Sequence, residues 1–253
     1  MSKVKLFNVL FDNYDYDDLL GYIDRTIQSG KPSYILTCNV DHLMKLQSDA
    51  HFREVYNDAG AIVADGMPVV WASRLLKRRL KQRVAGADIV NELGNRLAKR
   101  GYRIFLLGAA EGIADRARCN LEVKIPGINV VGTYSPSYGF DRNEEECERI
   151  NAMLRIAKPD IVLVGAGAPK QEKWIYRHYR EYGAPISIGV GAALDFMAGE
   201  IKRAPVWFQR TSLEWLWRLF QEPKRLWRRY LVDDVKFLGL LIREMRVRKE
   251  ESR

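Results

Sequence analysis

The feature that most constrains the fold is a regular alternation of short β-branched runs with longer amphipathic stretches. The runs that we predict to be strands are Ser33–Thr37, Ala61–Ala64, Arg103–Leu107, Ile128–Gly132, Asp160–Val164 and Pro185–Ile188. The stretches that we predict to be helices are Val40–Asn57, Gly86–Arg100, Glu111–Lys124, Asn143–Lys158 and Lys170–Tyr182. Strands that alternate with helices in this way form parallel sheets with helices on both faces. The sequence therefore predicts an α/β fold with a mostly parallel, doubly wound sheet.

The alternation stops near Ala204, and the composition changes there. Residues 201–253 contain 14 Lys or Arg and 7 Asp or Glu, so they carry +7 of the chain's net charge of +9. Four of the six tryptophans also lie beyond this point. We therefore predict one domain at residues 1–204 and a helical, basic, aromatic appendage at residues 205–253, which Pro223 splits into two helices. The charge of the appendage favours an anionic surface as its partner.

The appendage is amphipathic if it is read as one helix from Lys224 onward. At 100° per residue, the basic residues that share an arc of about 100° are Arg225, Arg228, Arg229, Lys236, Arg243 and Arg246. The apolar residues on the opposite side are Leu226, Trp227, Tyr230, Leu231, Phe237, Leu238, Leu241 and Ile242. This pattern is typical of a helix that lies in a membrane interface. Packing of the apolar side on the α/β body or on a second subunit, as in a homo-oligomer, is the open alternative.

The composition argues against several classes of protein. Cys38, Cys119 and Cys147 form no C-x-x-C pair and no metal-ligand spacing with the histidines, which argues against a disulfide scaffold and a structural zinc site. The amino terminus does not have the pattern of a signal peptide, and the sequence has no run of about 18 apolar residues. We therefore expect a cytoplasmic protein that the appendage holds peripherally on the inner face of the plasma membrane.

Small and polar residues follow the predicted strands, where open parallel sheets bind ligands. Glycine-containing turns start at Gly108, Gly165 and Gly189, and their backbone N–H groups would approach a phosphate closely. Lys170 occupies the place of the third glycine of G-x-G-x-x-G, and no P-loop motif is present. These absences argue against a dinucleotide dehydrogenase and a P-loop ATPase. The alternative is that the glycines only permit tight turns and close packing.

Asp65 directly follows an apolar strand, so its carboxylate should lie at the edge of the sheet beside Thr37 and Asn39. A base at this place would take the proton from an attacking hydroxyl, which typically accelerates a reaction by about 10²–10⁴-fold. The alternative is a helix cap, since a helix begins near Pro68. The run Asp15-Tyr16-Asp17-Asp18 resembles a D-x-D metal pair, but it precedes an ordinary helix start, where acidic residues favour the helix dipole. We therefore predict no metal site.

Several motifs together resemble the WecG/TagA/CpsF family, glycosyltransferase family 26, over roughly residues 5–250. They are Thr37-x-Asn39-x-Asp41, Ala64-Asp65-Gly66-Met67-Pro68, Arg83-Val84-Ala85-Gly86-Ala87-Asp88, Gly165-x-Gly167-x-Pro169-Lys170-Gln171-Glu172 and Gly189-Val190-Gly191-x-x-x-Asp195. The resemblance implies a Rossmann-like fold of the GT-E type and an inverting, metal-independent transferase of bacterial surface-polymer synthesis. In the wall-teichoic-acid branch, such enzymes pass N-acetylmannosamine from its UDP derivative to N-acetylglucosamine on undecaprenyl diphosphate.

The resemblance also implies roles for individual residues. Asp65 becomes the catalytic base, with Thr37 beside it at the reacting sugars. The residues expected to bind donor or acceptor are Asn39, Arg83, Gly108, Gln171 and Asp195. The residues expected to grip the diphosphate of the lipid-linked acceptor are Arg218, Arg225 and Arg228. The UDP-sugar is a co-substrate, and no cofactor or metal is expected.

An inverting transfer also needs stabilisation of the leaving diphosphate. Arg83, aided by the N–H groups of the glycine turns, is the first candidate, and Lys170 and Arg203 are reserves. Arg83 could instead be a surface charge of the basic run Lys77–Arg83. A chain that ends near Ala204 should fold but lose transfer. Two other functions stay open, a non-catalytic module that binds membrane or nucleic acid and a nucleotide-dependent oxidoreductase; for the transferase itself we expect no nucleic-acid partner.

Overall fold

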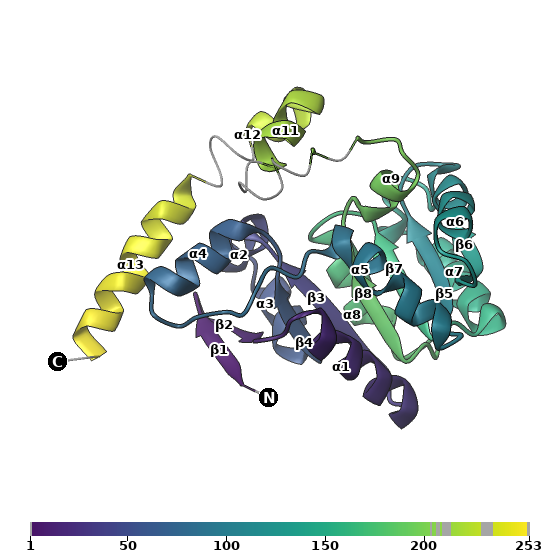
Figure 1. Ribbon diagram of the computed structural model, residues 1–253, viewed down its shortest axis with the longest axis horizontal. Helices are drawn as coiled ribbons and strands as arrows, with labels where there is room; N and C mark the ends of the chain where they lie inside the picture. The colour runs from purple at the N-terminus through teal and green to yellow at the C-terminus, as the bar shows by residue number, and fades with distance from the viewer. Residues whose placement is uncertain (1, 203, 206–207, 209–213, 229–234, 252–253) are drawn as a thin grey trace.

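The fold is built on a six-stranded sheet whose paired strands are all parallel. Figure 1 shows the computed structural model, which describes residues 2–202, 204–205, 208, 214–228 and 235–251. The strands are β3 (Ser33–Cys38), β4 (Ala61–Ala64), β5 (Arg103–Gly108), β6 (Asn129–Tyr134), β7 (Ile161–Gly165) and β8 (Ile186–Gly189). Their order across the sheet is β4-β3-β8-β7-β5-β6. The predicted Rossmann-like α/β fold is confirmed.

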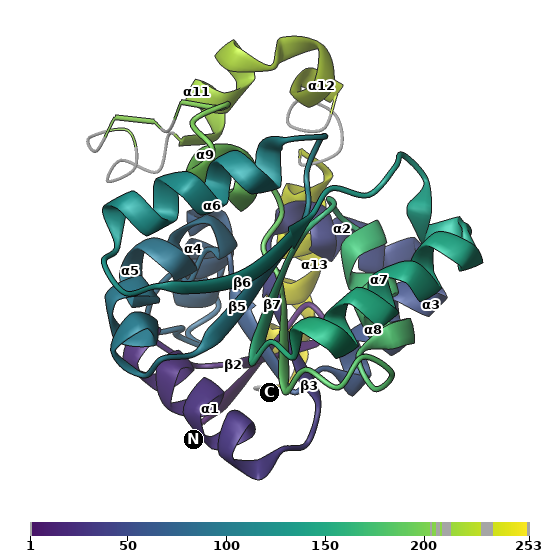
Figure 2. The same ribbon diagram turned by 90° about the vertical axis from the view of Figure 1, so that its right-hand side faces the viewer.

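Two layers of helices cover the sheet, one on each face, as Figure 2 shows from the side of β6. One face carries α2 (Val40–Ser48), α3 (Ala50–Asp58), α4 (Met67–Leu75), α7 (Glu144–Ala157) and α8 (Lys170–His178). The other carries α1 (Tyr16–Ser29), α5 (Gly86–Lys99), α6 (Ile113–Lys124) and α9 (Ala193–Met197). Side chains alternate along a strand, so Tyr34 and Leu36 of β3 enter the first core and Ile35 enters the second.

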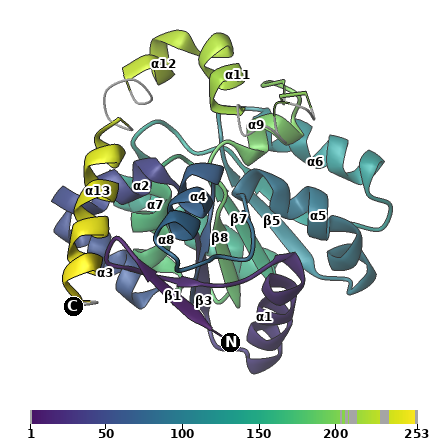
Figure 3. The same cartoon turned by 60° about the vertical axis from the view of Figure 1, so that its left-hand side comes forward.

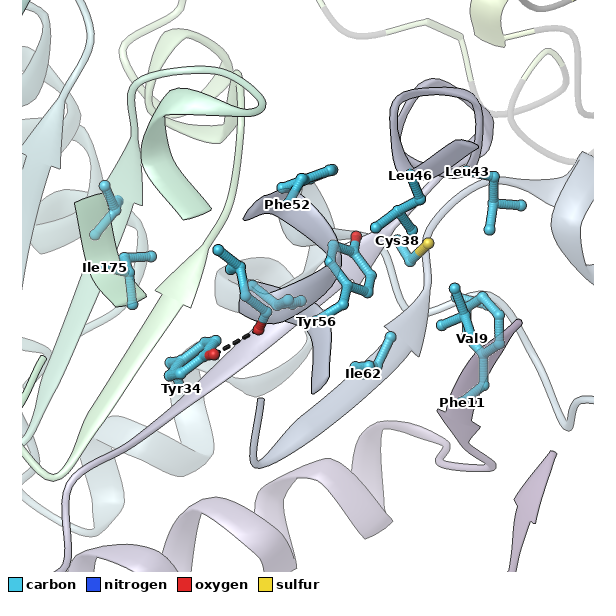
Figure 4. Packing of buried hydrophobic residues seen from close by; sticks show 14 of the residues in the cluster. Val9, Phe11, Tyr34, Cys38, Leu43, Leu46, Phe52, Tyr56, Ile62 and Ile175 are labelled. Atoms are coloured by element: carbon cyan, nitrogen blue, oxygen red, sulfur yellow. Dashed lines mark hydrogen bonds between the residues drawn. The ribbon is translucent and has the colours of Figure 1, made fainter. Parts of the chain in front are cut away.

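The first core is the one shown in Figure 4. Apolar side chains of α2 and α3, among them Leu46 and Phe52, pack over Ile62 of β4. The hydroxyl of Tyr34 donates a hydrogen bond to the carbonyl oxygen of Val55, which joins α3 to strand β3. These contacts hold the helices on which several site residues lie.

One predicted helix, Val40–Asn57, is two helices that meet at Asp49. The N–H of Asp49 donates to the carbonyl of Lys45 and closes α2, while its carboxylate accepts from the N–H of Phe52 and caps α3. The backbone of Asp49 is extended, with φ −101° and ψ 100°. A residue that ends one helix and caps the next needs no intervening loop, so the amphipathic pattern continued across the break and concealed it.

The strands of the amino-terminal hairpin were not predicted. β1 (Lys3–Leu6) and β2 (Val9–Asp12) pair antiparallel through Phe7 and Asn8, which have φ values of 51° and 63°. Two-residue turns of this kind favour Asn-Gly or Asp-Gly, and Phe at the first position hides the signal. The buried carboxylate of Asp12 accepts a hydrogen bond of 2.9 Å from the N–H of Ile62 and joins the hairpin to β4.

The carboxyl-terminal region contains α11 (Glu214–Gln221), α12 (Pro223–Arg228) and α13 (Lys236–Glu251). Pro223 begins α12, which confirms the predicted split. Val235 lies in a turn directly before α13, so the single helix assumed from Lys224 onward is wrong. The assumption failed because an amphipathic pattern continues in phase by chance across a turn.

One side of α13 packs on the α/β body, alongside α2 (Figure 3). Phe237 is buried with its ring centroid 5.2 Å from that of Phe7, and Glu244 pairs with Arg78 at 3.3 Å. The opposite side of α13 exposes large apolar side chains. With Val235, which directly precedes α13, they form what we call the outer stripe: Val235, Leu238, Ile242 and Met245. The division of the chain into domains at Ala204 stays a prediction. In the part of the chain that the structure describes, no helix has the length and apolarity that crossing a bilayer requires.

Candidate functional site

Asp65 lies at the carboxyl edge of the sheet, directly after β4. Its backbone N–H donates to the carbonyl oxygen of Cys38 at 2.8 Å, which extends the pairing of β4 with β3 by one step. Its side chain is half-buried. Helix α4 takes Gly66, not Asp65, as its N-cap residue, so the helix-cap alternative receives no support from the structure.

Thr37 lies on the same face of the sheet as Asp65. Its strand partner is Val63, and Asp65 follows Val63 by two residues, so the alternation of side chains directs Thr37 and Asp65 to one face. The buried hydroxyl of Thr37 donates to the carbonyl oxygen of Gly189 on β8 at 2.9 Å. A methyl group added at Gly86, the first residue of α5, would come within 3.2 Å of this hydroxyl. The register therefore puts both side chains on one face at the same edge of the sheet, and a direct contact between them stays a prediction.

Arg83 and Tyr16 complete a charged and polar group around Asp65. The N–H of Val84 donates to the carbonyl of Ala64 at 2.8 Å, so the loop that carries Arg83 runs beside the end of β4. Burial raises the pKa of Tyr16 to about 12; the nearby Arg83 guanidinium opposes this shift and the Asp65 carboxylate adds to it. Both charges therefore act on the same phenol.

The Arg83 guanidinium is held in place by Asp88 of α5, with Nη2 2.5 Å from Oδ2. The side chain of Arg83 is 22% exposed and that of Asp88 is 7% exposed. A side chain this enclosed and paired is not a freely solvated surface charge, which removes the alternative based on the basic run.

Asn39 and Asp195 lie at the same edge with roles in local structure. The Asn39 amide oxygen accepts from the N–H of His42 at 3.2 Å and caps α2. The carbonyl oxygen of Asp195 accepts from the N–H groups of Glu200 and Ile201 and ends the turn after α9. For both residues, direct contact with a substrate stays a prediction.

The glycine turns pack tightly against each other. Gly108 has φ +125°, and a methyl group added there would lie 2.5 Å from the carbonyl carbon and oxygen of Gly165. A methyl group at Gly165 would in turn lie 2.8 Å from the carbonyl oxygen of Gly191. The backbones of the three turns approach so closely at Gly108 and Gly165 that only glycine, which has no side chain, fits there. Contact of Gly108 with a substrate stays a prediction.

Four N–H groups of these turns are already hydrogen-bonded within the protein. Those of Ala166, Gly167 and Gly191 all donate to the amide oxygen of Gln171, at 3.1 to 3.2 Å. The N–H of Ala109 donates to the carbonyl of Gly165. These four donors are not available to a phosphate in this structure, and a phosphate contact by the rest of the turns stays a prediction. Gln171 itself is buried, so the structure shows it organising two turns, and its contact with a ligand stays a prediction.

The remaining predicted cations are placed only in part. Lys170 begins α8, and its ammonium lies 4.6 Å from the centroid of the Tyr138 ring. Arg203 lies outside the described residues. The backbones of Arg218, Arg225 and Arg228 belong to α11 and α12, but their side chains lie outside what the structure describes.

The acidic run at the start of α1 is a capping box. The carboxylate of Asp15 accepts from the N–H of Asp18, and that of Asp18 accepts from the N–H of Asp15. Among the described residues, no group of three or more His, Cys, Asp or Glu side chains has the arrangement of a metal site. Independence from metals itself stays a prediction.

Two surface hollows lie away from Asp65. One, of about 520 Å³, is lined by Asn13, Arg74, Arg79, Leu80 and Lys81. The other, of about 510 Å³, lies at the opposite, amino end of the strands and includes Pro159, Asp160 and Pro185. Asp65 and Thr37 line neither hollow, so the candidate site is recognised from its chemistry and its place at the sheet edge.

Three residues near this edge were missed by sequence reasoning: Tyr16, His42 and Glu172. Tyr16 was hidden in the acidic run, which reads as a helix start. Glu172 directly follows Gln171, and His42 stands three residues after Asn39. Closeness in sequence to a predicted site residue is the signal that could have identified them. Both are buried.

The sequence is similar to known proteins over nearly its whole length. Residues 4–251 match the Glycosyl transferase WecG/TagA/CpsF family. A protein of Staphylococcus aureus (strain MW2), named N-acetylglucosaminyldiphosphoundecaprenol N-acetyl-beta-D-mannosaminyltransferase, is 31% identical over 90% of this chain and 88% of its own length. A protein of Bacillus subtilis (strain 168) with the same name is 32% identical over 91% of this chain and 88% of its own length. The match covers nearly all of the chain, so this protein belongs to the WecG/TagA/CpsF family of glycosyltransferases.

Proposed function

We propose that this glycosyltransferase moves N-acetylmannosamine from UDP-N-acetylmannosamine onto N-acetylglucosaminyldiphosphoundecaprenol, in the synthesis of a cell-wall polymer of the teichoic acid type. The relatives that carry this activity in their names align with about nine-tenths of the chain. The observation that carries the chemistry is the carboxylate of Asp65, which lies at the strand ends with Thr37 on the same face and Arg83 nearby. Neither the family nor the relatives support the oxidoreductase or the non-catalytic module.

The proposed reaction is a single displacement with inversion at the anomeric carbon. Asp65 accepts the proton of the acceptor's hydroxyl group while the hydroxyl oxygen forms a bond to the anomeric carbon of the donor. The bond between that carbon and the diphosphate oxygen breaks, and UDP leaves. Arg83 stabilises the charge that develops on the diphosphate, in place of a metal ion. In the structure Asp88 holds this guanidinium at the sheet edge, so its position is set before the donor binds.

The test of this assignment is the Asp65→Asn variant, assayed with UDP-N-acetylmannosamine and the lipid-linked acceptor in excess EDTA. Loss of the base should lower kcat by about 10²–10⁴-fold while the fold is retained. Asp17→Asn is the matched control, because Asp17 is an exposed aspartate of α1 that pairs with Arg96. The wild-type enzyme should stay active in EDTA. Near-wild-type turnover of a folded Asp65→Asn protein would reject Asp65 as the base, and activity restored only by Mg²⁺ or Mn²⁺ would reject metal independence.

We further propose that the protein binds peripherally to the inner face of the plasma membrane, where its acceptor is held. Support comes from the outer stripe of α13, which is apolar and is accompanied by the exposed cations Lys236, Arg243 and Arg246. Apolar side chains that enter the headgroup region, with cations beside them, are the features of an interfacial helix. A homo-oligomer formed through the same stripe is the competing use of this surface.

A further inference from the structure

A cluster of buried polar side chains lies beneath the carboxyl edge of the sheet. It consists of Gln171 and Glu172 of α8, His42 of α2 and Tyr56 of α3. All four are almost completely buried, and none belongs to the group of Tyr16, Asp65 and Arg83. Polar groups are costly to bury unless they are hydrogen-bonded, so a cluster of this kind calls for a physical explanation.

The orientation of the Gln171 amide is fixed by its partners. Its oxygen accepts from the N–H groups of Ala166 and Gly167, after β7, and of Gly191, after β8. Its NH₂ group donates to Oε1 of Glu172 at 2.5 Å. If the amide were reversed, its NH₂ group would face three N–H donors and its oxygen would face a carboxylate. Only one orientation therefore joins the two turns.

Glu172 is the acceptor that selects this orientation, with His42 behind it. Nε2 of His42 lies 3.8 Å from Oε1 of Glu172, and Nδ1 of His42 lies 2.6 Å from the hydroxyl oxygen of Tyr56. If the Tyr56 hydroxyl donates to Nδ1, the imidazole N–H is on Nε2 and faces the carboxyl group. Oε2 of Glu172 has no hydrogen-bond partner among the residues that the structure describes. A carboxyl oxygen that carries no proton only accepts, so Oε1 of Glu172 specifies where the NH₂ group of Gln171 must lie.

A single glycine separates this cluster from Thr37. The carbonyl oxygen of Gly189 accepts from the Thr37 hydroxyl. A methyl group added at Gly189 would lie 2.9 Å from Nε2 of Gln171 and 3.2 Å from Oε1 of Glu172. The cluster is thus in close contact with the strand end that holds Thr37, as well as with the two turns.

We propose that Glu172 and His42 are positioning residues, which hold the Gln171 amide in the orientation that fixes the turns after β7 and β8 at the rim of the transferase site. The proposal rests on the function proposed above for its catalytic consequence. Neither residue touches the reacting sugars; both act through Gln171. Displacement by about 1 Å of a turn at the rim of a site can cost about a hundredfold in rate. This cost gives a reason for a buried polar network beneath the two turns.

The test compares Glu172→Leu, which removes the acceptor, with Glu172→Gln, which keeps an oxygen that can accept. Two readouts are measured: hydrogen exchange of the Gly167 and Gly191 amides without substrate, and KM and kcat for the UDP-sugar. In Glu172→Leu, we expect exchange at both glycines to rise at least about tenfold, and kcat/KM to fall about ten- to a hundredfold, mainly through KM. Glu172→Gln should restore most of both. Because exchange is measured without substrate, it tests whether Glu172 holds the Gln171 amide in place even if the proposed activity is not found.

The matched control is Glu181→Gln. Glu181, like Glu172, pairs with a histidine: its Oε2 lies 2.7 Å from Nδ1 of His178, at the opposite end of α8 from Glu172. It should change neither readout. If Glu172→Leu does not fold, His42→Phe keeps the aromatic contacts with Phe52 and Tyr56 and should change both readouts in the same direction by a smaller factor. Wild-type exchange at Gly167 and Gly191 in a folded variant would overturn the proposal, and so would faster exchange with unchanged KM and kcat.

Discussion

Two carboxylates near the carboxyl edge of the sheet lie in different environments. Asp65 is half-buried, near the Arg83 guanidinium and the Tyr16 phenol, while Glu172 is 1% exposed and contacts an amide and an imidazole. Environment determines whether a carboxyl group exchanges protons with a substrate or serves the structure. The different environments of the two residues therefore support the roles proposed for them, catalysis for Asp65 and organisation of the turns for Glu172.

At the residue scale, the burial of Glu172 predicts how stability depends on pH. Burial raises the pKa of Glu172 from 4.5 to about 7. Between these values the unfolded chain has lost a proton that the folded protein retains, so wild-type stability falls as pH rises and the full cost is present above pH 7. Glu172→Gln cannot ionise, so its advantage in the free energy of unfolding should be near zero at pH 4 and grow to about 3 kcal/mol at pH 8.

Urea unfolding of both proteins at several pH values checks this expectation. Glu145→Gln, which removes an exposed carboxylate from α7, is the control for a change of surface charge. A stability difference between wild type and Glu172→Gln that is the same at pH 5 and pH 8 would contradict the assignment of a buried, proton-retaining carboxyl group.

Much of the site's layout follows from strand ends, which a sequence reveals. Asp65 and Thr37 were expected together because each stands at the end of an apolar run, and parallel strands bring such ends to one edge. The function of Gln171 was not visible in this way. The amide oxygen of Gln171 accepts hydrogen bonds from the N–H groups of two turns, and one of these donors, Gly191, lies twenty residues further along the chain. Such a contact depends on how the turns fold back, which no local pattern records.

At the element scale, the six strands of the parallel sheet were predicted to within about two residues because buried parallel strands are nearly continuous apolar runs. The missed turn and helix boundary contain residues that are atypical of such positions or that serve two neighbouring elements at once. Phe7 occupies a turn position with φ 51°, and Asp49 ends α2 and caps α3 at once. The glycine turns were predicted, but one reason for the glycines was not fully visible. Strands β5 and β7 approach so closely at Gly108 that no side chain fits there.

This close approach predicts the effect of Gly108→Ala. The added methyl group would lie 2.5 Å from the Gly165 carbonyl group, at a φ of +125° that L-residues rarely adopt. Backbone strain and overpacking together should lower the free energy of unfolding by about 3 kcal/mol or more. Gly112→Ala is the matched control, because Gly112 also has positive φ, +75°, but no atom lies within 4 Å of the added methyl group.

Gly112→Ala should cost only about 1 kcal/mol, from the backbone conformation alone. Guanidinium unfolding of the three proteins gives both values. Equal losses in the two variants would show that conformation, and not the contact between β5 and β7, is what requires glycine at position 108.

At the scale of the whole molecule, packing of the appendage on the α/β body is confirmed for one side of α13, and binding of its other side to a membrane stays a prediction. Phe237 and Glu244 attach α13 to the body, through Phe7 and Arg78, while the outer stripe faces away from it. The helical wheel drawn from Lys224 placed Phe237, Leu238 and Ile242 on one side and therefore could not separate these two uses. The separation depends on where the hairpin lies, because Phe7 provides the surface that buries Phe237. Removal of the chain beyond Ala204 would thus uncover Phe7.

The exposed stripe predicts that membrane binding is a property of α13 that can be removed without unfolding the body. In the double variant Leu238→Ser/Ile242→Ser, two side chains with exposed fractions of 60% and 52% lose their apolar surface. Burial of that surface in a bilayer should contribute about 2 kcal/mol, so binding to vesicles that contain phosphatidylglycerol should weaken roughly thirtyfold. Ile156→Ser is the matched control, since Ile156 is equally apolar and is 82% exposed on α7.

Co-sedimentation at low and high salt separates the apolar from the electrostatic contribution, because each cation near an anionic leaflet adds about 1 kcal/mol that salt screens. The double variant should bind weakly at both salt concentrations, whereas the wild type should weaken mainly at high salt. Sedimentation of both proteins without vesicles tests the competing use of the stripe. If the double substitution leaves vesicle binding unchanged and dissociates an oligomer, the stripe is an interface between copies, and the membrane must be reached through another surface.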